Sequence, residues 1–523
     1  MKVGVPDCVQ TRLPARLQVV WFKRDLRTFD NEALFRACAS GPTLCFYVVE
    51  PDYWQSKSTS NRQWLFVRES LEDLAKQLKK LGASLVVHQG TVVQSLEEFR
   101  RQYGSLTLHS HQETGNLWTF ERDKTVARWC RAHQCNWHEY AQNGVSRPVS
   151  RRKSRFKDHW DQWAAASMFP TPSPSNFVAQ DPGLLPAQWP MAVCSDPYPC
   201  AGRQPGGRAE GLAVLDSFLS HRGEAYRGSI SSPLTAESGC SRLSAHIAYG
   251  CVSLREIAQR VAGAQAHAST AQWRHSLSAY YTRLWWHCYF IQTFENKPSI
   301  EDTPLLPEMA LLNRPFDQAK FDAWRRGQTG WPLVDACMRY LHHHGWINFR
   351  MRAMLVSAAT YSLSLPWRPV ADWLAGLFVD FEPGIHYPQI QMQSGTAGGT
   401  VLRVYNPVTQ ATTLDAEGHF VKRWMPELRN VSQAWIFEPW KMTLNLRQQA
   451  GWTQDSFYPC PLVDFERVHK DAKAEITALR AAHQLTPAGG FKKRNTNHRV
   501  KRITAGMKET KKLADNAEQL DLF

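Results

Sequence analysis

Residues 17–27 read LQVVWFKRDLR, an apolar run that ends in charged residues. A short apolar run closed by polar residues is typical of a buried β-strand followed by a loop. Similar runs occur at 43–50, 84–88 and 106–109. The segments beside them have helical spacing and predict helices over 31–39, 61–82, 92–103 and 119–133. We therefore expect an α/β fold with a parallel sheet covered on both faces, which binds ligands at the carboxyl ends of its strands.

The remaining chain divides by composition. At roughly 150 residues per domain, 523 residues are enough for two to four domains. We expect the α/β domain to span 1–145. Residues 146–207 are basic and then Pro-rich, which predicts a linker over the surface rather than a folded unit. Residues 208–485 predict a mainly helical domain, with amphipathic stretches at 210–220, 242–262, 271–293, 332–344, 346–365 and 369–379. Residues 486–523 are basic and of low hydrophobicity, which predicts a disordered tail, either a solvated terminus or a nonspecific DNA arm.

Composition excludes several classes of protein. A hydrophobic share of 43% rules out general disorder. No run of about 18 uncharged apolar residues occurs, which argues against a transmembrane helix. The first twenty residues carry four charges and no apolar core, so we expect a protein of the cytosol without a secretory signal.

The charge and the cysteines indicate the kind of partner. Lysine and arginine exceed acidic residues by 62 − 47 = 15, which favours a polyanion such as nucleic acid over a merely basic protein. The twelve cysteines are scattered without a CxxC pair, so we expect reduced structural cysteines and no metal centre. Tryptophan is frequent, with 21 residues that pack cores but also stack on bases and flavins.

Five motifs in order resemble the photolyase/cryptochrome family over about residues 17–470. The first is VWFKRDLR at 20–27 followed by DNEAL at 30–34. The second is SRLS at 241–244 with GCVS at 250–253, which resembles the family's flavin phosphate segment. The others are WRRGQTGWPLVDA at 324–336, Gly345-Trp346 with Arg350 and Arg352, and RVYNP at 403–407 with FVKRWMPEL at 420–428.

The resemblance implies an antenna-binding α/β domain and an all-helical FAD-binding domain. It implies a blue-light-driven deoxyribodipyrimidine photo-lyase that splits cyclobutane pyrimidine dimers in UV-damaged DNA with an electron from excited reduced FAD, acting as a monomer. The alternatives are a cryptochrome-like photoreceptor that signals through a partner and a dark nucleic-acid-binding protein. The antenna chromophore could be a deazaflavin, a folate or absent, and Arg27 and Glu113 are candidates to line its pocket.

The resemblance also assigns residues. Arg352 and Asp380 resemble the ion pair beside the isoalloxazine ring, although they could be only a buried structural pair. Ser241 and Ser244 offer hydroxyls to a diphosphate, although Ser241 could be a plain N-cap. The full assignment has catalytic residues Trp367, His386, Arg352 and Asp380; cofactor-binding residues Tyr226, Cys240, Ser241, Arg242, Leu243, Ser244, Arg283, Asp380, Phe381 and Glu382; and DNA-binding residues Trp285, Trp286, Trp346 and Arg350.

Several positions depart from the family's pattern. His386, with the adjacent Tyr387 as an alternative, falls where the family usually has Asn, or Asp in plant cryptochromes, facing flavin N5, and histidine titrates near neutrality. Ile390 and Arg314 fall at the positions of two of the three tryptophans that pass electrons to the flavin in relatives. Electrons would therefore need another route here, and Trp331, Trp346 and Trp373 are candidates for it. Dimer-recognition positions carry Ala279 and Thr282, and Asn348 and Phe349 stand where (6-4) photolyases have paired histidines.

Overall fold

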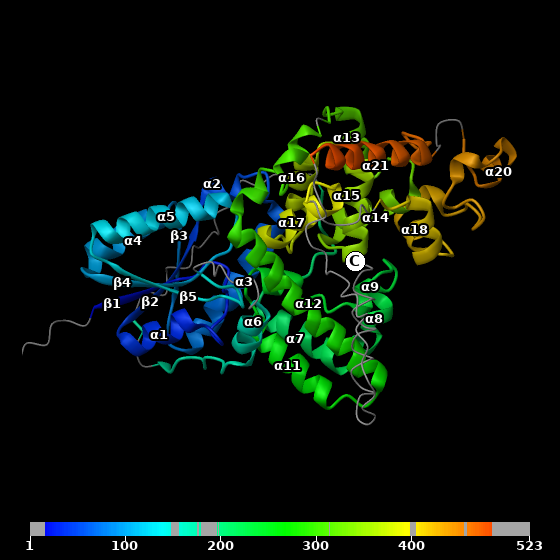
Figure 1. Cartoon of the computed structure of the whole chain (residues 1–523). Helices are drawn as coiled ribbons and strands as arrows, with labels where there is room; N and C mark the ends of the chain where they lie inside the picture. The colour runs from blue at the N-terminus through cyan, green and yellow to red at the C-terminus, as the bar shows by residue number, and fades with distance from the viewer. Residues whose placement is uncertain are drawn as a thin grey trace, which may run out of the picture.

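The amino-terminal domain is built on a five-stranded parallel sheet. The computed structural model describes residues 16–147, 156–174, 177–178, 196, 198–312, 314–397, 404–453 and 458–483. The strand order is β3-β2-β1-β4-β5, so the chain reverses its direction of winding between β1 and β4 (Figure 1). The strands are β1 Leu17–Trp21, β2 Thr43–Val49, β3 Leu85–Gln89, β4 Leu106–His111 and β5 Asn136–Tyr140.

Alternate residues of the central strand enter two different cores, as a sheet covered on both faces requires. Val20 and Phe22 pack with α1 and α3, whereas Val19 and Trp21 pack with α4 and α5. Figure 1 shows α1 on the opposite side of the sheet from α4 and α5. The predicted parallel sheet is therefore confirmed. The helices are α1 Glu32–Ser40, α2 Pro51–Trp54, α3 Asn61–Lys80, α4 Val92–Tyr103 and α5 Leu117–Ala132.

Two elements differ from the expectation. Strand β5 was not predicted, because its sequence NWHEY is polar and the strand lies half-exposed at the sheet edge. Within the predicted linker 146–207, Phe156–Ala165 forms helix α6, whose Trp160 is fully buried against α11 and α12. Part of that segment is thus a folded unit. The basic run 148–155 and the predicted disordered tail 486–523 lie outside the described residues.

The rest of the chain is helical, as predicted. The predicted helix over 242–262 is divided in two by a turn at Gly250, whose φ is +62°. The helices are α7 Arg208–Ser220, α8 Tyr226–Ser229, α9 Ala236–Gly239, α10 Ser244–Ala248, α11 Leu254–Ala266, α12 Ala271–Asn296, α13 Gln318–Arg326, α14 Pro332–His344, α15 Phe349–Ser357, α16 Trp367–Leu377, α17 Pro383–Ser394, α18 Pro407–Leu414, α19 His419–Trp424, α20 Leu444–Gln449 and α21 Phe465–Ala482. Shorter 3₁₀ segments are Arg222–Ala225, Pro298–Glu301, Pro307–Leu311, Pro426–Leu428 and Pro439–Lys441, and Ala358–Ser362 forms a π-helix after α15.

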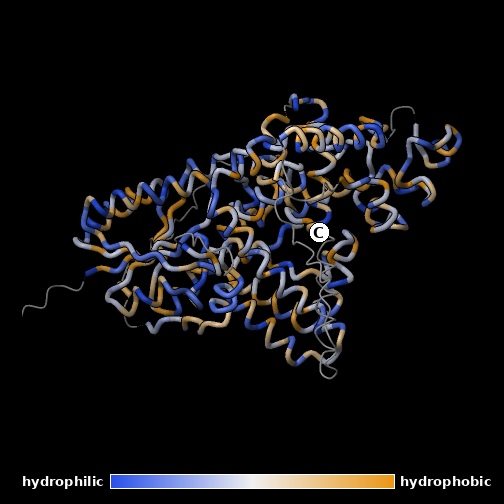
Figure 2. The backbone as a smooth tube through the Cα atoms, in the orientation of Figure 1, coloured by the Kyte–Doolittle hydropathy of each residue, from blue (hydrophilic) through white to orange (hydrophobic). Residues whose placement is uncertain are grey.

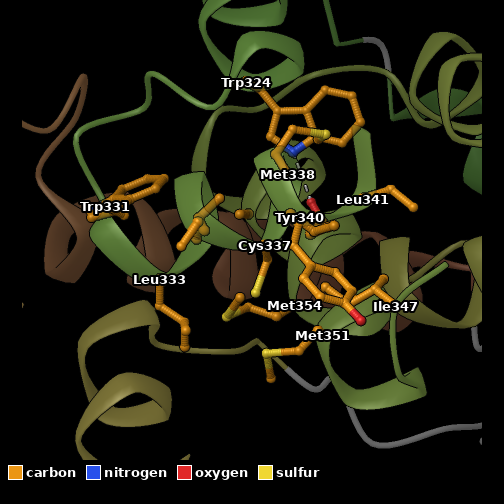
Figure 3. Close-up of a cluster of buried hydrophobic side chains, with 14 of the residues drawn as sticks. Trp324, Trp331, Leu333, Cys337, Met338, Tyr340, Leu341, Ile347, Met351 and Met354 are labelled. Atoms are coloured by element: carbon orange, nitrogen blue, oxygen red, sulfur yellow. Dashed lines mark hydrogen bonds between the residues drawn. The ribbon is translucent and has the colours of Figure 1, made fainter. Parts of the chain in front are cut away.

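The core of the helical domain is centred on α14 and α15. Figure 3 shows Trp324 and Trp331 flanking the side chains of α14, with Met351 and Met354 of α15 beneath them. Trp324 is fully buried, and its indole N–H donates to the carbonyl of Leu355 at 3.1 Å. A buried indole with a satisfied N–H adds apolar area without the cost of an unpaired donor.

The most recognisable motif, residues 324–336, has a structural role. Asp335 is fully buried and accepts hydrogen bonds from Thr329 N and Oγ1, from Gly330 N and from Tyr458 Oη, at 2.5–3.1 Å. Burial raises the pKa of Asp335 to about 6. These bonds hold the loop before α14, which positions Trp331 in the core.

The two domains are joined by polar side chains that donate to backbone carbonyls. Arg62 of α3 is fully buried and donates to the carbonyls of Leu341 and Leu377. Gln63 donates to the carbonyl of Phe378 at 2.9 Å. A Cβ on Gly250 would lie only 2.1 Å from the Arg24 carbonyl, so this close approach requires glycine.

Along the helices, hydrophilic and hydrophobic residues alternate instead of forming long apolar segments (Figure 2). Among the described helices, none is long and apolar enough to cross a bilayer.

Candidate cofactor-binding site

The helical domain encloses a cavity of about 390 Å³. Its walls come from α12, α15, α16 and α17 and from the SRLS segment at 241–244. Its lining is mainly apolar and includes the rings of Trp286, Phe290, Trp346, Phe378 and Phe381. A cavity of a few hundred cubic ångströms with few polar groups is typical of a cofactor site.

A buried ion pair lies on the wall of this cavity. Arg352 Nη2 donates to Asp380 Oδ2 at 2.7 Å, and Arg352 Nε donates to the carbonyl of Ile347 at 2.8 Å. The Asp380 side chain is 4% exposed, and the Arg352 guanidinium lies 4.0 Å from the centre of the Phe378 ring. The second carboxylate oxygen of Asp380 is buried and has no hydrogen-bond partner among the described residues. The pair therefore offers the cavity a free acceptor as well as a positive charge.

Polar groups suited to phosphate lie at another part of the wall. Ser241, Arg242, Ser244 and Arg283 all line the cavity. The Ser244 hydroxyl is buried without a partner in the described structure. Arg242 has a positive φ of 60°, which is uncommon outside glycine and frequent at functional sites. Its guanidinium lies over the Trp346 ring at 4.0 Å. Helix α10 spans five residues, so the hydroxyls and guanidinium groups rather than a long helix dipole make this part attractive to an anion.

His386 lines the cavity as a neutral imidazole. Burial lowers its pKa to about 4, and the nearby Arg352 also lowers it. The expectation that His386 titrates near neutrality does not hold for the folded chain. Its Nε2 lies 2.9 Å from the carbonyl of Ala371, which only accepts, so Nε2 carries the proton and Nδ1 is left as an acceptor.

The residues present fit FAD. Four cavity-lining side chains have a buried polar oxygen without a partner in the described structure: Ser244, Asn348, Asp380 and Gln389. Buried polar groups are normally hydrogen-bonded, so unpaired oxygens around one cavity indicate a ligand with donor groups. A flavin ring, a ribityl chain and an adenine supply such N–H and O–H donors, and the arginines suit the diphosphate.

The structure brings most of the predicted residues to the cavity. Four lie elsewhere. Leu243 is fully buried in the core around α11 and α12, and Trp285 packs on Phe156 of α6. Trp367 lines a separate cavity of about 270 Å³, and Arg350 bonds Gln410. Those that line the cavity are Tyr226, Cys240, Ser241, Arg242, Ser244, Arg283, Trp286, Trp346, Arg352, Asp380, Phe381, Glu382 and His386.

Sequence reasoning missed His287. It lies one helical turn after Arg283 on the same face of α12 and lines the cavity. Its Nε2 is 3.2 Å from Glu382, and both side chains also line a smaller cavity between the two domains. The i, i+4 spacing from Arg283 was the signal that could have found it.

The crevice at the strand ends does not fit a second ring chromophore. The cavities there measure about 30 and 40 Å³, a tenth of the flavin cavity. Arg122 occupies the crevice, bonded to Glu50 at 3.0 Å and to Glu113 at 2.5 Å, with its guanidinium 4.7 Å from the Trp21 ring. Arg24 lies beside them, 3.6 Å from Glu113. These side chains fill the crevice at the carboxyl ends of the strands.

The described part of the chain contains no group of three or more His, Cys, Asp or Glu side chains that could hold a metal ion. The histidine run at 342–344 is used in packing. His342 stacks on Tyr198 with ring centres 3.8 Å apart, and His343 and His344 pack against Trp424.

Comparison with known proteins agrees with this geometry. The family model for DNA photolyase matches residues 18–174, and the model for the FAD binding domain of DNA photolyase matches residues 280–478. The deoxyribodipyrimidine photo-lyase of Alkalihalophilus pseudofirmus is 25% identical over 87% of this chain and 97% of the relative. The cryptochrome DASH of a Synechocystis species is 26% identical over 86% and 95% of the two chains.

A solved structure supports the fold. The bacterial class III photolyase from Agrobacterium tumefaciens matches with a TM-score of 0.75 and 23% identity, over 91% of this chain and all of that one. The matched models cover the sheet domain and the cavity-forming helices, in the order expected from the motifs. With its parallel-sheet domain, its helical FAD-binding domain and relatives of both names, the chain belongs to the photolyase/cryptochrome family.

Proposed function

We propose that this protein is a blue-light-driven photolyase that splits cyclobutane pyrimidine dimers in DNA. The observation that supports this most is the cavity in which the Arg352–Asp380 pair and the phosphate-suited residues surround unpaired polar oxygens. FAD held there in its reduced form would supply the light-driven one-electron chemistry that opening the dimer needs.

The chain's own residues would hold the parts of FAD. Ser241, Ser244 and Arg283 would bind the diphosphate, and the free oxygen of Asp380 would accept a ring N–H. Arg352 would place positive charge against the flavin ring, which stabilises a reduced anionic flavin. His386 would present a neutral acceptor at all physiological pH values, because its pKa is about 4.

DNA would bind beside Trp346. The net charge of +15 favours association with the phosphate backbone. Trp286 offers an aromatic face for stacking bases at the cavity, and Trp346 lines the same cavity. Arg350 lies two residues from Arg352, is half-buried and donates to Gln410 at 3.3 Å, and we assign its positive charge to a phosphate of the bound strand. We place the protein in the cytosol as a monomer.

A cryptochrome-like photoreceptor is the second candidate, and two positions favour it. Ala279 packs partly buried against the core of α11 and α12. The Thr282 hydroxyl donates to the carbonyl of Ser278 in its own helix. Neither residue offers a carboxylate or a ring to a dimer, so dimer recognition would depend on Trp346 and its neighbours.

Repair of a dimer-containing oligonucleotide separates the two candidates. Chemically reduced, FAD-loaded protein is expected to restore intact thymines under blue light and not in the dark. Arg350→Ala is expected to weaken binding to the damaged strand and to lower its salt dependence. The matched control is Arg128→Ala, an exposed arginine on α5 of the sheet domain, which should bind as the parent does. Turnover that is absent in light with FAD fully bound would reject the photolyase assignment and favour the photoreceptor.

A further inference from the structure

Helix α12 carries a chain of aromatic rings from the cofactor cavity to the surface. Trp286 lines the cavity. Its ring centre lies 5.5 Å from that of Tyr289 and 5.2 Å from that of Trp285. Trp285 and Tyr289 stack at 5.3 Å with an interplanar angle of 20°. Tyr289 is 41% exposed, which is high for a large aromatic residue, so the chain ends in water.

We infer that Trp286 and Tyr289, with Trp285 beside them, form an electron relay that reduces the bound flavin in light. The inference requires flavin in the cavity but does not depend on repair of DNA. Tryptophan and tyrosine are the side chains that can lose one electron and regain it, and the contacts are short enough for the rings to exchange one. Phenylalanines on the cavity wall cannot serve in this way.

The other oxidisable rings on the wall do not lead outward. Tyr226 contacts Tyr280, and both are at most 6% exposed. Both phenols are thus shielded from the water that would take up the proton of an oxidised tyrosine. Trp346 is covered by the Arg242 guanidinium at 4.0 Å, and that charge opposes the removal of an electron.

The part of the wall formed by α17 has no such chain in the described structure. Ile390 lines the cavity there and cannot carry an electron. Trp367 lies in the separate cavity next to Arg314, which is anchored to the Thr360 carbonyl and lies 3.4 Å from Glu475. Among the described rings that line the cavity, Trp286 is therefore the one that further redox-active rings connect to solvent.

Electrons and protons balance with a thiol as the external reductant. With oxidised flavin bound and excited by light, Trp286 would give it one electron and regain one from Tyr289. Tyr289 loses its phenolic proton to water as it loses the electron. A thiol in solution returns one electron and one proton to Tyr289, and two oxidised thiols join as a disulfide.

The test is the rate of flavin photoreduction in the FAD-loaded full chain, without oxygen and with dithiothreitol, read as loss of oxidised-flavin absorbance. Trp286→Phe and Tyr289→Phe are each expected to slow it at least tenfold. Trp273→Phe is the matched control on the same helix and should match the parent. Reduction by dithionite in the dark should be unchanged in every variant, which separates a lost relay from lost cofactor.

Two results would overturn the inference. One is photoreduction at the parent's rate in Tyr289→Phe, which tests the relay even if Trp286→Phe loses FAD. The other is a rate that depends on Trp367 and not on Trp286. A slow Tyr289→Phe with normal FAD content and normal dithionite reduction supports it.

Discussion

Removal of the Asp380 carboxylate should separate the cofactor role of the ion pair from its structural role. In Asp380→Ala, the free oxygen that faces the cavity disappears. A hydrogen bond to a charged acceptor contributes about 1.5–3 kcal/mol. Because about 1.4 kcal/mol corresponds to a factor of ten, the dissociation constant of FAD should rise about 10- to 150-fold.

The cost to the fold should be smaller than for a fully buried pair. Removing one partner of a buried pair costs about 3–5 kcal/mol. Arg352, however, is 25% exposed and keeps its bond to the carbonyl of Ile347, so we expect about 1–3 kcal/mol. Asp380→Asn keeps a neutral acceptor and should weaken FAD only about tenfold.

The assay is titration of the apoprotein with FAD by fluorescence, together with denaturant unfolding monitored by circular dichroism. Asp372→Ala is the matched control, because Asp372 bonds Arg368 at 3.0 Å on α16 outside the flavin cavity. It should lose stability without losing FAD affinity. If Asp380→Ala binds FAD within about twofold of the parent, the assignment of this carboxylate to the flavin is refuted.

Three further predictions concern the fold. Gly250→Ala should destabilise the fold by more than about 3 kcal/mol, because the φ of Gly250 is +62° and the new Cβ would meet the Arg24 carbonyl at 2.1 Å. The control Gly263→Ala on α11 has nothing within 4 Å of the new Cβ and should be neutral or stabilising, and equal denaturation midpoints for the two variants would contradict the prediction. The pKa of Asp335 is raised to about 6, so its contribution to stability is present below pH 4 and is lost as the pH rises through 6. Between pH 4 and pH 7, the free energy of unfolding of Asp335→Asn should therefore rise by about 3 kcal/mol relative to that of the parent. A difference in unfolding free energy that stays constant over this range would argue against the shift. The pKa of His386 is lowered to about 4, so the contribution of the neutral imidazole to stability is present above pH 6.5 and is lost as the pH falls. The melting temperature of His386→Gln should therefore approach that of the parent only below about pH 5. Melting temperatures of the two proteins that become equal near neutrality would show an exposed imidazole instead.

The strands that the sequence predicted share one property, which is burial on both faces. Such strands read as continuous apolar runs, as β1 and β2 do. Strand β5 lies at the edge, and its exposed Asn136, His138 and Glu139 leave no apolar run that would mark it as a strand. The division of 242–262 depends on Gly250, and the reason for it is the Arg24 carbonyl of the other domain. Contacts between residues so far apart in the chain leave no mark on local periodicity.

The candidate site shows the same limit. Consecutive residues of a helix point about 100° apart, so the sequence alone does not say which of Trp285 and Trp286 faces the cavity. The motif located the pair, but only the packing of α12 against α6 and α17 selects Trp286. The charge state of His386 is likewise set by burial among Phe378 and Phe381 rather than by the residue type.

Arg24 explains why the first motif bears on a cavity in the other domain. Its guanidinium donates to the carbonyl of Phe381 at 3.0 Å and to Tyr53 Oη at 3.1 Å, and it lies 5.1 Å from the Tyr249 ring. Phe381 stands between Asp380 and Glu382 on the cavity wall. The residue at the end of β1 therefore fixes the backbone that carries the acidic pair, while its own carbonyl leaves room only for Gly250. Loss of this guanidinium would release the flavin wall and the domain contact together, so the charged end of LQVVWFKRDLR serves the helical domain as much as the sheet.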